Sequence, residues 1–354
     1  MKKLMSGNAA LGEAAILSGC TCYFGYPITP QNELTEYMAK RMGELGRVFI
    51  QSESEIAAIN MVLGASVAGA RAMTSSSSPG MSLKQEGISY LAADELPAVV
   101  VNMVRGGPGM GNISPAQSDY LQATRGGGHG DYKTIVLAPG SVQELTEVVP
   151  LAFDLADRYR NPVVILGDGM LGQMMEPVSF DNIEPPKEYP KDYILTGAKG
   201  RPSRMVRSLL FDTKEEEEHN WKLVRKYQRM EQNEVRYERF MTDDADMVVI
   251  AYGIGARIVK GAIRRLRQEN MKVGMIRPIT AWPFPSAVLQ ELATTVRDFF
   301  VFEMSAGQMI EDVKLALAGK GRIHFYGRPG GVIPTPVELY RIIGRHYYMA
   351  ARRK

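Results

Sequence analysis

Three short segments in the first half of the chain each place a polar side chain where an apolar stretch ends. These are residues 26–30, 51–58 and 101–107. They contribute the hydroxyl of Thr29, the carboxylate of Glu55 and the guanidinium of Arg105. Open α/β sheets bind ligands at such strand ends. Together, these three groups could contact a cofactor ring and the carboxylate of an acid substrate.

Each of the three side chains also has an ordinary structural explanation. Glu55 begins an Ala-rich helix, where a carboxylate interacts favourably with the helix dipole. The apolar residues after it predict instead that this helix starts inside an interface, where an unpaired carboxylate is costly. Arg105 could pair with a nearby acid, and Thr29 could cap the helix after Pro30. The residues alone leave these alternatives open.

Three further motifs favour structural roles or remain open. Gly253-Ile254-Gly255 follows an apolar strand but lacks the third glycine of a dinucleotide fingerprint, which favours a tight turn. Gly167-Asp168-Gly169 is similar to the start of the magnesium-diphosphate motif of thiamine diphosphate enzymes. The Asn pair that completes that motif is missing from residues 192–199, so a structural turn is again favoured. His129 stands among glycines, and a contact with substrate is left open.

Alternating strands and helices must position these groups. The expected strands are 22–26, 48–51, 70–75, 97–104, 134–137 and 162–166, and the expected helices are 8–17, 31–45, 55–69, 81–93 and 142–159. Repeated strand–helix units with apolar strands predict a parallel sheet covered on both faces. Residues 105–132 contain eight glycines without an apolar period and predict a long loop, of a kind that is often functional.

The composition divides the chain into three parts. Residues 1–185 form the first α/β unit, and residues 186–242 carry prolines and charge runs that predict a linker with exposed helices. Residues 243–354 form a second α/β unit. Its expected strands are 247–252, 273–276 and 299–302, and its expected helices are 256–268, 285–293 and 337–348.

Charge and cysteine content exclude several classes of protein. The 354 residues carry a net charge of +3 with both signs interleaved, so a nucleic acid partner is not expected. Cys20 and Cys22 are too close for an ordinary disulfide and too few for a zinc or iron–sulfur site, so no metal site is expected on this chain. No apolar run approaches the length of a membrane span, which predicts a cytoplasmic protein without a membrane partner.

Several segments together resemble the α subunit of 2-oxoacid:ferredoxin oxidoreductases. They are residues 26–30, residues 51–58, the strand end at Arg105, and residues 114–120 and 126–132 of the glycine-rich loop. The resemblance spans almost the whole chain and favours the branched-chain type, which acts on 2-oxoisovalerate (3-methyl-2-oxobutanoate). It implies an α/β fold with a pyrimidine-type, thiamine diphosphate-binding, doubly wound domain followed by a transketolase C-terminal-like α/β domain.

The resemblance also implies cofactors and partners. This chain would hold the aminopyrimidine of thiamine diphosphate, and a β subunit would hold the diphosphate, Mg²⁺ and a 4Fe–4S cluster. A γ subunit and a ferredoxin-like δ subunit would complete the assembly. The reaction would be oxidative decarboxylation, with coenzyme A taking the acyl group and ferredoxin taking the electrons.

For individual residues, the resemblance implies that Glu55 meets the pyrimidine ring nitrogen, with Glu53 as second choice. Thr29 and Arg105 would face the keto and carboxylate oxygens of the substrate. Further cofactor contacts would come from Pro27, Ile28, Ser78 and Gly80, and the substrate pocket would include Gln117, Asp119 and His129.

Other functions remain open from the sequence. The substrate could be 2-oxoglutarate or pyruvate; a second substrate carboxylate would need another cation, for which Arg125 is the candidate in the loop. The chain could also be part of a non-redox thiamine diphosphate enzyme, or a scaffold subunit. Residues 326–331 favour a turn beside an interface over an anion contact, and Cys20 and Cys22 have no assigned role.

Overall fold

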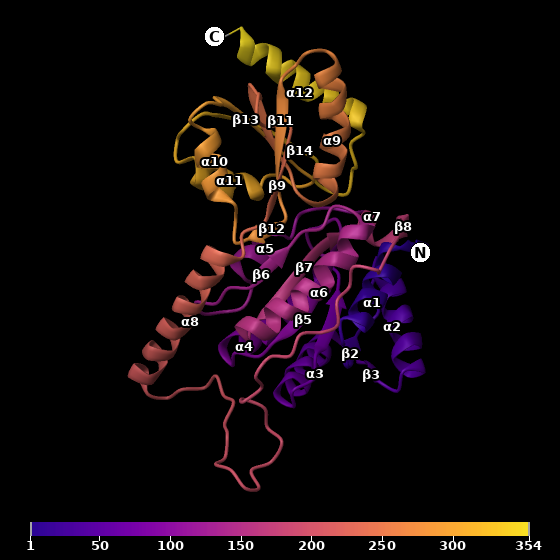
Figure 1. Ribbon diagram of the computed structural model, residues 1–354, viewed down its shortest axis with the longest axis vertical. Coiled ribbons are helices and arrows are strands. Elements are labelled where there is room, and N and C mark those ends of the chain that lie inside the picture. The colour runs from indigo at the N-terminus through magenta and orange to yellow at the C-terminus, as the bar shows by residue number, and fades with distance from the viewer. Residues whose placement is uncertain (1, 353–354) are drawn as a thin grey trace.

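The computed structural model describes residues 2–352, and its larger sheet has seven strands in the order β12-β6-β7-β5-β4-β2-β3 (Figure 1). Its parallel strands are β2 (Cys22–Gly25), β3 (Val48–Gln51), β4 (Ala72–Ser76), β5 (Ala98–Val104), β6 (Ile135–Leu137) and β7 (Pro162–Asp168). Every residue of β4, β5, β6 and β7 is buried, which requires cover on both faces of the sheet. The predicted parallel sheet is therefore confirmed.

Long helices provide that cover. They are α1 (Gly7–Leu17), α2 (Asn32–Glu44), α3 (Glu55–Val67), α4 (Ser78–Ala93) and α6 (Val142–Tyr159). Helix α1 packs against both α2 and α6, whereas α3 packs against α4. Two glycines allow α3 and α4 to come close together, because a Cβ at Gly87 would lie 2.5 Å from Ile59, and one at Gly80 would lie 2.3 Å from Glu55.

Short elements differ from the sequence prediction. Helix α5 (Tyr120–Arg125) lies inside the segment predicted as a continuous loop. Tyr120 and Thr124 are buried there, and the Tyr120 hydroxyl donates a 2.6 Å hydrogen bond to Asp312 of the second unit. Helix α7 (Gly169–Gln173) and the antiparallel pair β1 (Lys3–Ser6) and β8 (Met175–Val178) were not predicted either. Tertiary contacts, rather than local periodicity, support these elements.

Residues 181–212 run as an extended segment and lead into helix α8 (Thr213–Asn233), seen at the lower side of Figure 1. Asp212 caps this helix by accepting hydrogen bonds from the amides of Lys214 and Glu215. The sequence predicted exposed helices here. The structure has one long helix, and it buries one face through Leu223, Lys226, Tyr227 and Met230.

The second unit contains a five-stranded sheet in the order β14-β13-β10-β11-β9. The strands are β9 (Tyr237–Phe240), β10 (Met247–Ile250), β11 (Val273–Pro278), β13 (Asp298–Glu303) and β14 (Arg322–Gly327). Helices α9 (Gly253–Gln268), α10 (Ser286–Leu292), α11 (Met309–Leu317) and α12 (Pro336–Ala351) accompany them. All strand pairs are parallel except β9 with β11. Strand β14 and helix α11 had no counterpart in the prediction.

The two units share strands. Strand β9 comes from the segment predicted as a linker and pairs with β11 of the second sheet. Strand β12 (Thr280–Trp282) comes from the second unit and pairs antiparallel with β6 of the first sheet. The proposed division into residues 1–185, 186–242 and 243–354 cuts across this pairing.

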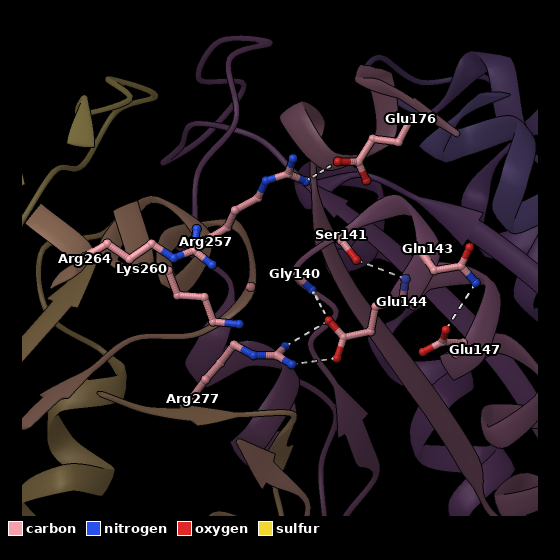
Figure 2. A pocket seen from close by; sticks show the side chains of 11 residues that line it. Gly140, Ser141, Gln143, Glu144, Glu147, Glu176, Arg257, Lys260, Arg264 and Arg277 are labelled. Atoms are coloured by element: carbon pink, nitrogen blue, oxygen red, sulfur yellow. Dashed lines mark hydrogen bonds and ion pairs between the residues drawn. The ribbon is translucent and has the colours of Figure 1, made fainter. Parts of the chain in front are cut away.

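A cleft of about 520 Å³ between the two units is lined with charged side chains (Figure 2). Arg277 of β11 donates two hydrogen bonds of 2.9 Å to Glu144 of α6. Arg257 of α9 forms an ion pair of 2.5 Å with Glu176 of β8. These ion pairs join the two units across the cleft. Within residues 2–352, no helix combines the length and apolar content needed to cross a membrane.

Candidate active site

The three side chains with which the sequence analysis began follow neighbouring strands of the first sheet. Thr29 follows β2, Glu55 follows β3 and Arg105 follows β5, and these strands run parallel in the order β5-β4-β2-β3. Ser78 follows β4 in the same way. The carboxyl ends of parallel strands lie at one edge of a sheet, so one edge carries all four residues.

Glu55 is the first residue of α3, and it is 4% exposed. The helix begins there because the Ser54 hydroxyl accepts a 3.2 Å hydrogen bond from the amide of Ala57. The Ser76 hydroxyl donates a hydrogen bond of 3.3 Å to Glu55 Oε1. In contrast, Glu53 is exposed. The buried carboxylate at this site is therefore that of Glu55.

Gly80 makes room for Glu55. A Cβ at Gly80 would lie 2.3 Å from Glu55 Oε1 and 2.0 Å from Ser76 Oγ, distances that real Cβ contacts do not reach. The Gly80 backbone thus forms one wall around the carboxylate. This explains why a glycine stands in the first turn of α4, where its helix propensity is unfavourable.

Arg105 is 6% exposed and holds its guanidinium between two backbone carbonyls. Nη1 donates to the Thr29 oxygen at 2.9 Å, and Nη2 donates to the Met110 oxygen at 3.1 Å. Among residues 2–352, the buried Nε has no hydrogen-bond partner and no carboxylate forms an ion pair with Arg105. The ion-pair alternative is therefore wrong for the described chain. A buried cation without a counter-anion is costly, and a ligand carboxylate would satisfy it.

Thr29 is half-buried, and its hydroxyl accepts a 3.4 Å hydrogen bond from Asn32 Nδ2. Helix α2 has Gln31 at its N-cap, and in the described part of the chain no side-chain hydrogen bond caps it. The capping alternative for Thr29 is therefore wrong. Pro27 is exposed and Ile28 is half-buried beside it, so this segment presents both an apolar surface and a hydroxyl.

Asp119 connects the glycine-rich loop to the strand ends. Its Oδ2 accepts hydrogen bonds from Ser78 Oγ at 2.7 Å and from Asn102 Nδ2 at 2.9 Å. Ser78 Oγ in turn accepts a 3.0 Å hydrogen bond from the Arg105 amide. Burial raises the pKa of Asp119, and the two hydrogen bonds that it accepts act in the opposite direction. Asp119 thus holds Ser78 and the start of the loop in place.

Gln117 and His129, assigned by the resemblance to the substrate pocket, make other contacts in the structure, and their assignment stays a prediction. The buried Gln117 side chain donates to the Tyr252 oxygen at 3.0 Å and accepts from the Met304 amide at 2.9 Å, so it joins the loop to the second unit. His129 is exposed and lines a hollow of about 410 Å³ between the end of α4 and α8. Just before Gln117, Pro115 pairs with Arg105 in an antiparallel β-bridge.

Lys84, which no sequence motif indicated, is fully buried in α4. Its Nζ donates to the backbone oxygen of Glu55 at 3.3 Å and to Thr74 Oγ1 at 3.0 Å. Burial lowers the pKa of Lys84 to about 7, although the charge of Glu55 acts to raise it. The sequence spacing could have indicated that Lys84 lies near Glu55, because Lys84 is four residues after Gly80 and hence on the same face of α4.

The remaining motifs have structural roles. The Asp168 carboxylate caps α7 by accepting hydrogen bonds of 3.0 Å from the amides of Met170 and Leu171. Burial raises the pKa of Asp168 to about 7. Gly253 begins α9 with a positive φ of 53°, as a tight turn requires. Arg125 forms an ion pair of 2.5 Å with Asp312 of the second unit.

Residues 326–331 form the end of β14 and the turn before α12. Arg328 forms an ion pair of 3.0 Å with Glu338 at the start of α12. The backbone oxygen of Gly330 accepts a 3.0 Å hydrogen bond from Asn112. This turn therefore packs against the loop that follows Arg105.

Comparisons with known proteins agree on one class. A family model described as "Pyruvate flavodoxin/ferredoxin oxidoreductase, thiamine diP-bdg" matches residues 13–242. A second, described as "Pyruvate:ferredoxin oxidoreductase core domain II", matches residues 245–339. Together the two matches cover most of both α/β units.

Individual relatives are similar over nearly the whole chain. Ketoisovalerate oxidoreductase subunit VorB of Methanothermobacter marburgensis is 50% identical over 341 residues, which cover 96% of each protein. The 2-oxoglutarate synthase subunit KorA of the same organism is 38% identical over 368 residues, covering 96% of this chain and 98% of KorA.

A solved structure shows the same arrangement of elements. It is the 2-oxoglutarate:ferredoxin oxidoreductase from Magnetococcus marinus with 2-oxoglutarate, coenzyme A and succinyl-CoA bound. The TM-score is 0.86 at 28% sequence identity, and the match covers 98% of this chain and 65% of that one. This chain thus spans about two thirds of its structural neighbour.

Proposed function

Because this chain belongs to the pyruvate flavodoxin/ferredoxin oxidoreductase family, we propose that it is the α subunit of an enzyme that oxidatively decarboxylates a branched-chain 2-oxoacid to an acyl-coenzyme A. The family and the α/β fold class predicted from the sequence are confirmed. Membership of this family makes the chain a 2-oxoacid:ferredoxin oxidoreductase subunit, so the non-redox and scaffold alternatives lose their basis.

The observation that carries the proposal is the pair of buried, incompletely satisfied charged groups at one sheet edge. Glu55 offers a carboxylate with one hydrogen bond from Ser76, and Arg105 offers a guanidinium whose Nε has no partner among the described residues. The first family model describes a thiamine diphosphate-binding unit. A ring nitrogen of that cofactor and a carboxylate of a 2-oxoacid are the partners that these two groups need.

The residues present fit the aminopyrimidine part of thiamine diphosphate. Gly80 has no side chain, so the buried Glu55 carboxylate can lie against the backbone of α4, and among the described residues its Oε1 accepts one hydrogen bond, from Ser76. When bound, thiamine diphosphate supplies a carbon nucleophile and an electron sink for decarboxylation. We propose that the Glu55 carboxyl group shares a proton with the ring nitrogen. Movement of this proton between the two groups activates the cofactor. Ser76 orients the carboxylate for this role. Pro27, Ile28 and Ser78 are proposed as further contacts.

Arg105 and Thr29 are proposed to bind the 2-oxoacid. The Arg105 guanidinium can form charge-assisted hydrogen bonds to the substrate carboxylate. The Thr29 hydroxyl is proposed to donate to the keto oxygen. Two carbonyls hold Arg105 in place, so the guanidinium is preorganised and little side-chain freedom is lost on binding. Asp119 supports this arrangement through Ser78.

We propose 2-oxoisovalerate as the substrate. The ketoisovalerate oxidoreductase subunit has the higher identity of the two curated relatives described above. The structure adds a physical argument, since Arg125 was the candidate cation for the second carboxylate of 2-oxoglutarate. Arg125 is engaged by Asp312 of the second unit, so an apolar substrate side chain suits this chain better.

The remaining parts of the enzyme are proposed to lie on partner subunits. The relatives are named as subunits, so the enzyme has more than one chain. We propose that a β subunit binds the diphosphate, Mg²⁺ and a 4Fe–4S cluster, and that γ and ferredoxin-like δ subunits complete the assembly. Coenzyme A is the proposed acyl acceptor and ferredoxin the proposed electron acceptor.

The test is viologen reduction by the natively purified complex with thiamine diphosphate, Mg²⁺ and coenzyme A. We expect 2-oxoisovalerate to give the highest kcat/KM when compared with 2-oxoglutarate and pyruvate. A preference for 2-oxoglutarate or pyruvate would replace the substrate and keep the reaction. If none of the three acids reduced the dye in a complex with intact clusters, the proposed reaction would be refuted.

A further inference from the structure

Lys84 occupies a buried position, where the desolvation of a lysine ammonium group is costly. The side chain is fully buried, and Nζ donates to the Glu55 backbone oxygen and to Thr74. Among residues 2–352, Lys84 forms no ion pair with a carboxylate. An apolar side chain of similar length would fill the same space without the desolvation cost of an ammonium group. The core alone therefore gives no reason for a lysine.

The charged and titratable groups around Lys84 identify the group that it can influence. Besides Cys22, the first residue of β2, the elements packed around it carry five titratable side chains, namely Glu55 on α3, Glu86 and Tyr90 on α4, Tyr23 on β2 and Asp168 on β7. Four of these have their own partners: Tyr90 donates to Glu86, Tyr23 bonds to Ser75, and Asp168 caps α7.

Glu55 differs from those four groups. Its backbone oxygen accepts a hydrogen bond from Lys84 Nζ, and its carboxylate charge acts to raise the pKa of Lys84. The same α3–α4 contact brings Gly80 against the carboxylate of Glu55. Lys84 and Glu55 are therefore coupled by geometry as well as by charge.

We propose that Lys84 is a positioning residue for Glu55. Lys84 fixes the first turn of α3, and its charge acts on the hydrogen bond between the Glu55 carboxyl group and the pyrimidine ring nitrogen. This inference rests on the proposed function, in which that carboxylate faces the pyrimidine ring nitrogen.

The direction of the effect follows from electrostatics. A positive charge beside a carboxylate favours its ionised form. A charged Lys84 therefore leaves the shared proton on the ring nitrogen, whereas a neutral Lys84 lets Glu55 keep it. Burial lowers the pKa of Lys84 to about 7, so this change falls near neutral pH. Lys84 does not touch the cofactor in this scheme and acts through Glu55.

The test compares wild type with Lys84→Met in the complete, cofactor-loaded complex. Near-UV circular dichroism of bound thiamine diphosphate reports the fraction of protonated aminopyrimidine. We expect Lys84→Met to lower that fraction at least threefold at pH 6, where Lys84 is charged in wild type. At pH 8.5, where Lys84 is neutral, the two spectra should converge. The kcat/KM profile should lose an inflection near pH 7.

Lys226→Met is the matched control. Lys226 is also buried and has a pKa lowered to about 8 by burial. It lies on α8, and its Nζ donates to the backbone oxygen of Arg160. Arg160 precedes β7, so this contact lies at the amino end of that strand. Its replacement should leave the dichroism of the cofactor unchanged at both pH values.

The possible outcomes separate the two proposals. Equal spectra at pH 6, or a difference of the same size at pH 6 and pH 8.5, would refute the charge role of Lys84. Full turnover in Glu55→Gln would instead refute the proposed function itself. Thermal unfolding of Lys84→Met shows whether the variant is folded. If it is not, Lys84→Gln, which keeps a donor and removes the charge, gives the same comparison of spectra.

Discussion

Arg105 Nη1 donates a 2.9 Å hydrogen bond to the backbone oxygen of Thr29, which joins the loop after β5 to the loop after β2. The two residues are 76 positions apart in the sequence. Strand β4 lies between their strands in the sheet, so the guanidinium reaches across its end. This contact fixes the distance between the two groups proposed to bind the 2-oxoacid.

Replacing Glu55 with Gln should abolish cofactor activation. The amide is nearly isosteric but cannot exchange a proton with the ring nitrogen, and loss of a positioned acid–base group costs about 10²–10⁴ in rate. We expect kcat for viologen reduction to fall by about this factor while the complex still assembles. Glu53→Gln is the control, because Glu53 is exposed two residues away. Equal loss in both variants would contradict the assignment.

Replacing Arg105 with Met should chiefly weaken use of the 2-oxoacid. A hydrogen bond to a charged group contributes about 1.5–3 kcal/mol, which corresponds to a factor of about 10–150 in kcat/KM. Thiamine diphosphate affinity should change less than threefold. Steady-state kinetics and a cofactor binding titration on the same preparation measure both quantities. A loss of cofactor binding with unchanged substrate kinetics would place Arg105 elsewhere in the mechanism.

Replacing Gly80 with Ala should disturb Glu55 through its backbone wall. The new Cβ would fall 2.0 Å from Ser76 Oγ and 2.3 Å from Glu55 Oε1, so the carboxylate must move. We expect thiamine diphosphate affinity and kcat each to drop at least tenfold. Gly64→Ala in α3 is the control, since no described atom lies within 4 Å of its new Cβ. Gly64→Ala should stabilise α3 by up to about 1 kcal/mol and leave activity unchanged.

The stability of the protein should depend on pH through Lys84. Burial lowers the pKa of Lys84 from 10.5 to about 7 in the folded state. Between these pH values the unfolded chain binds the extra proton, so the free energy of unfolding rises with pH in this window. The stabilising contribution of Lys84 to the free energy of unfolding is fully present above pH 10.5. It declines as pH falls and is lost below about pH 7.

Lys84→Met should therefore be more stable than wild type at pH 6, and this difference should shrink as pH rises above 7. Melting temperatures measured from pH 6 to 10 provide the comparison. Lys40→Met is the control, because Lys40 is exposed on α2. A pH-independent difference between wild type and Lys84→Met would contradict the expected titration.

Much of the first unit could be predicted from periodicity. Helix α6 and strand β3 have the predicted bounds, since one is strongly amphipathic and the other is a short apolar run between turn residues. Strand β14 was missed because Arg322 and His324 interrupt its apolar pattern. Both side chains bind Asp298 on the neighbouring strand, at 2.7 and 3.0 Å, a contact that sequence spacing does not reveal.

The candidate site was predictable in part, for a similar reason. Glu55, Thr29 and Arg105 follow parallel strands, so the rule for strand ends brings them to one edge. Gln117 and His129 lie in a loop without a period, and its path depends on contacts such as that of Gln117 with Met304. Lys84 was overlooked because a lysine in a helix is usually exposed.

The exchange of strands between the two units bears on how the polypeptide can be cut. A fragment that ends near residue 242 would carry β9 without β11 and would leave β6 with an uncovered edge. Uncovered strand edges are templates for aggregation. The complementary fragment would carry β12 without its partner in the first sheet. Recombinant study of either half alone, or division of the coding region between two plasmids, therefore needs a boundary that keeps each strand with its partner.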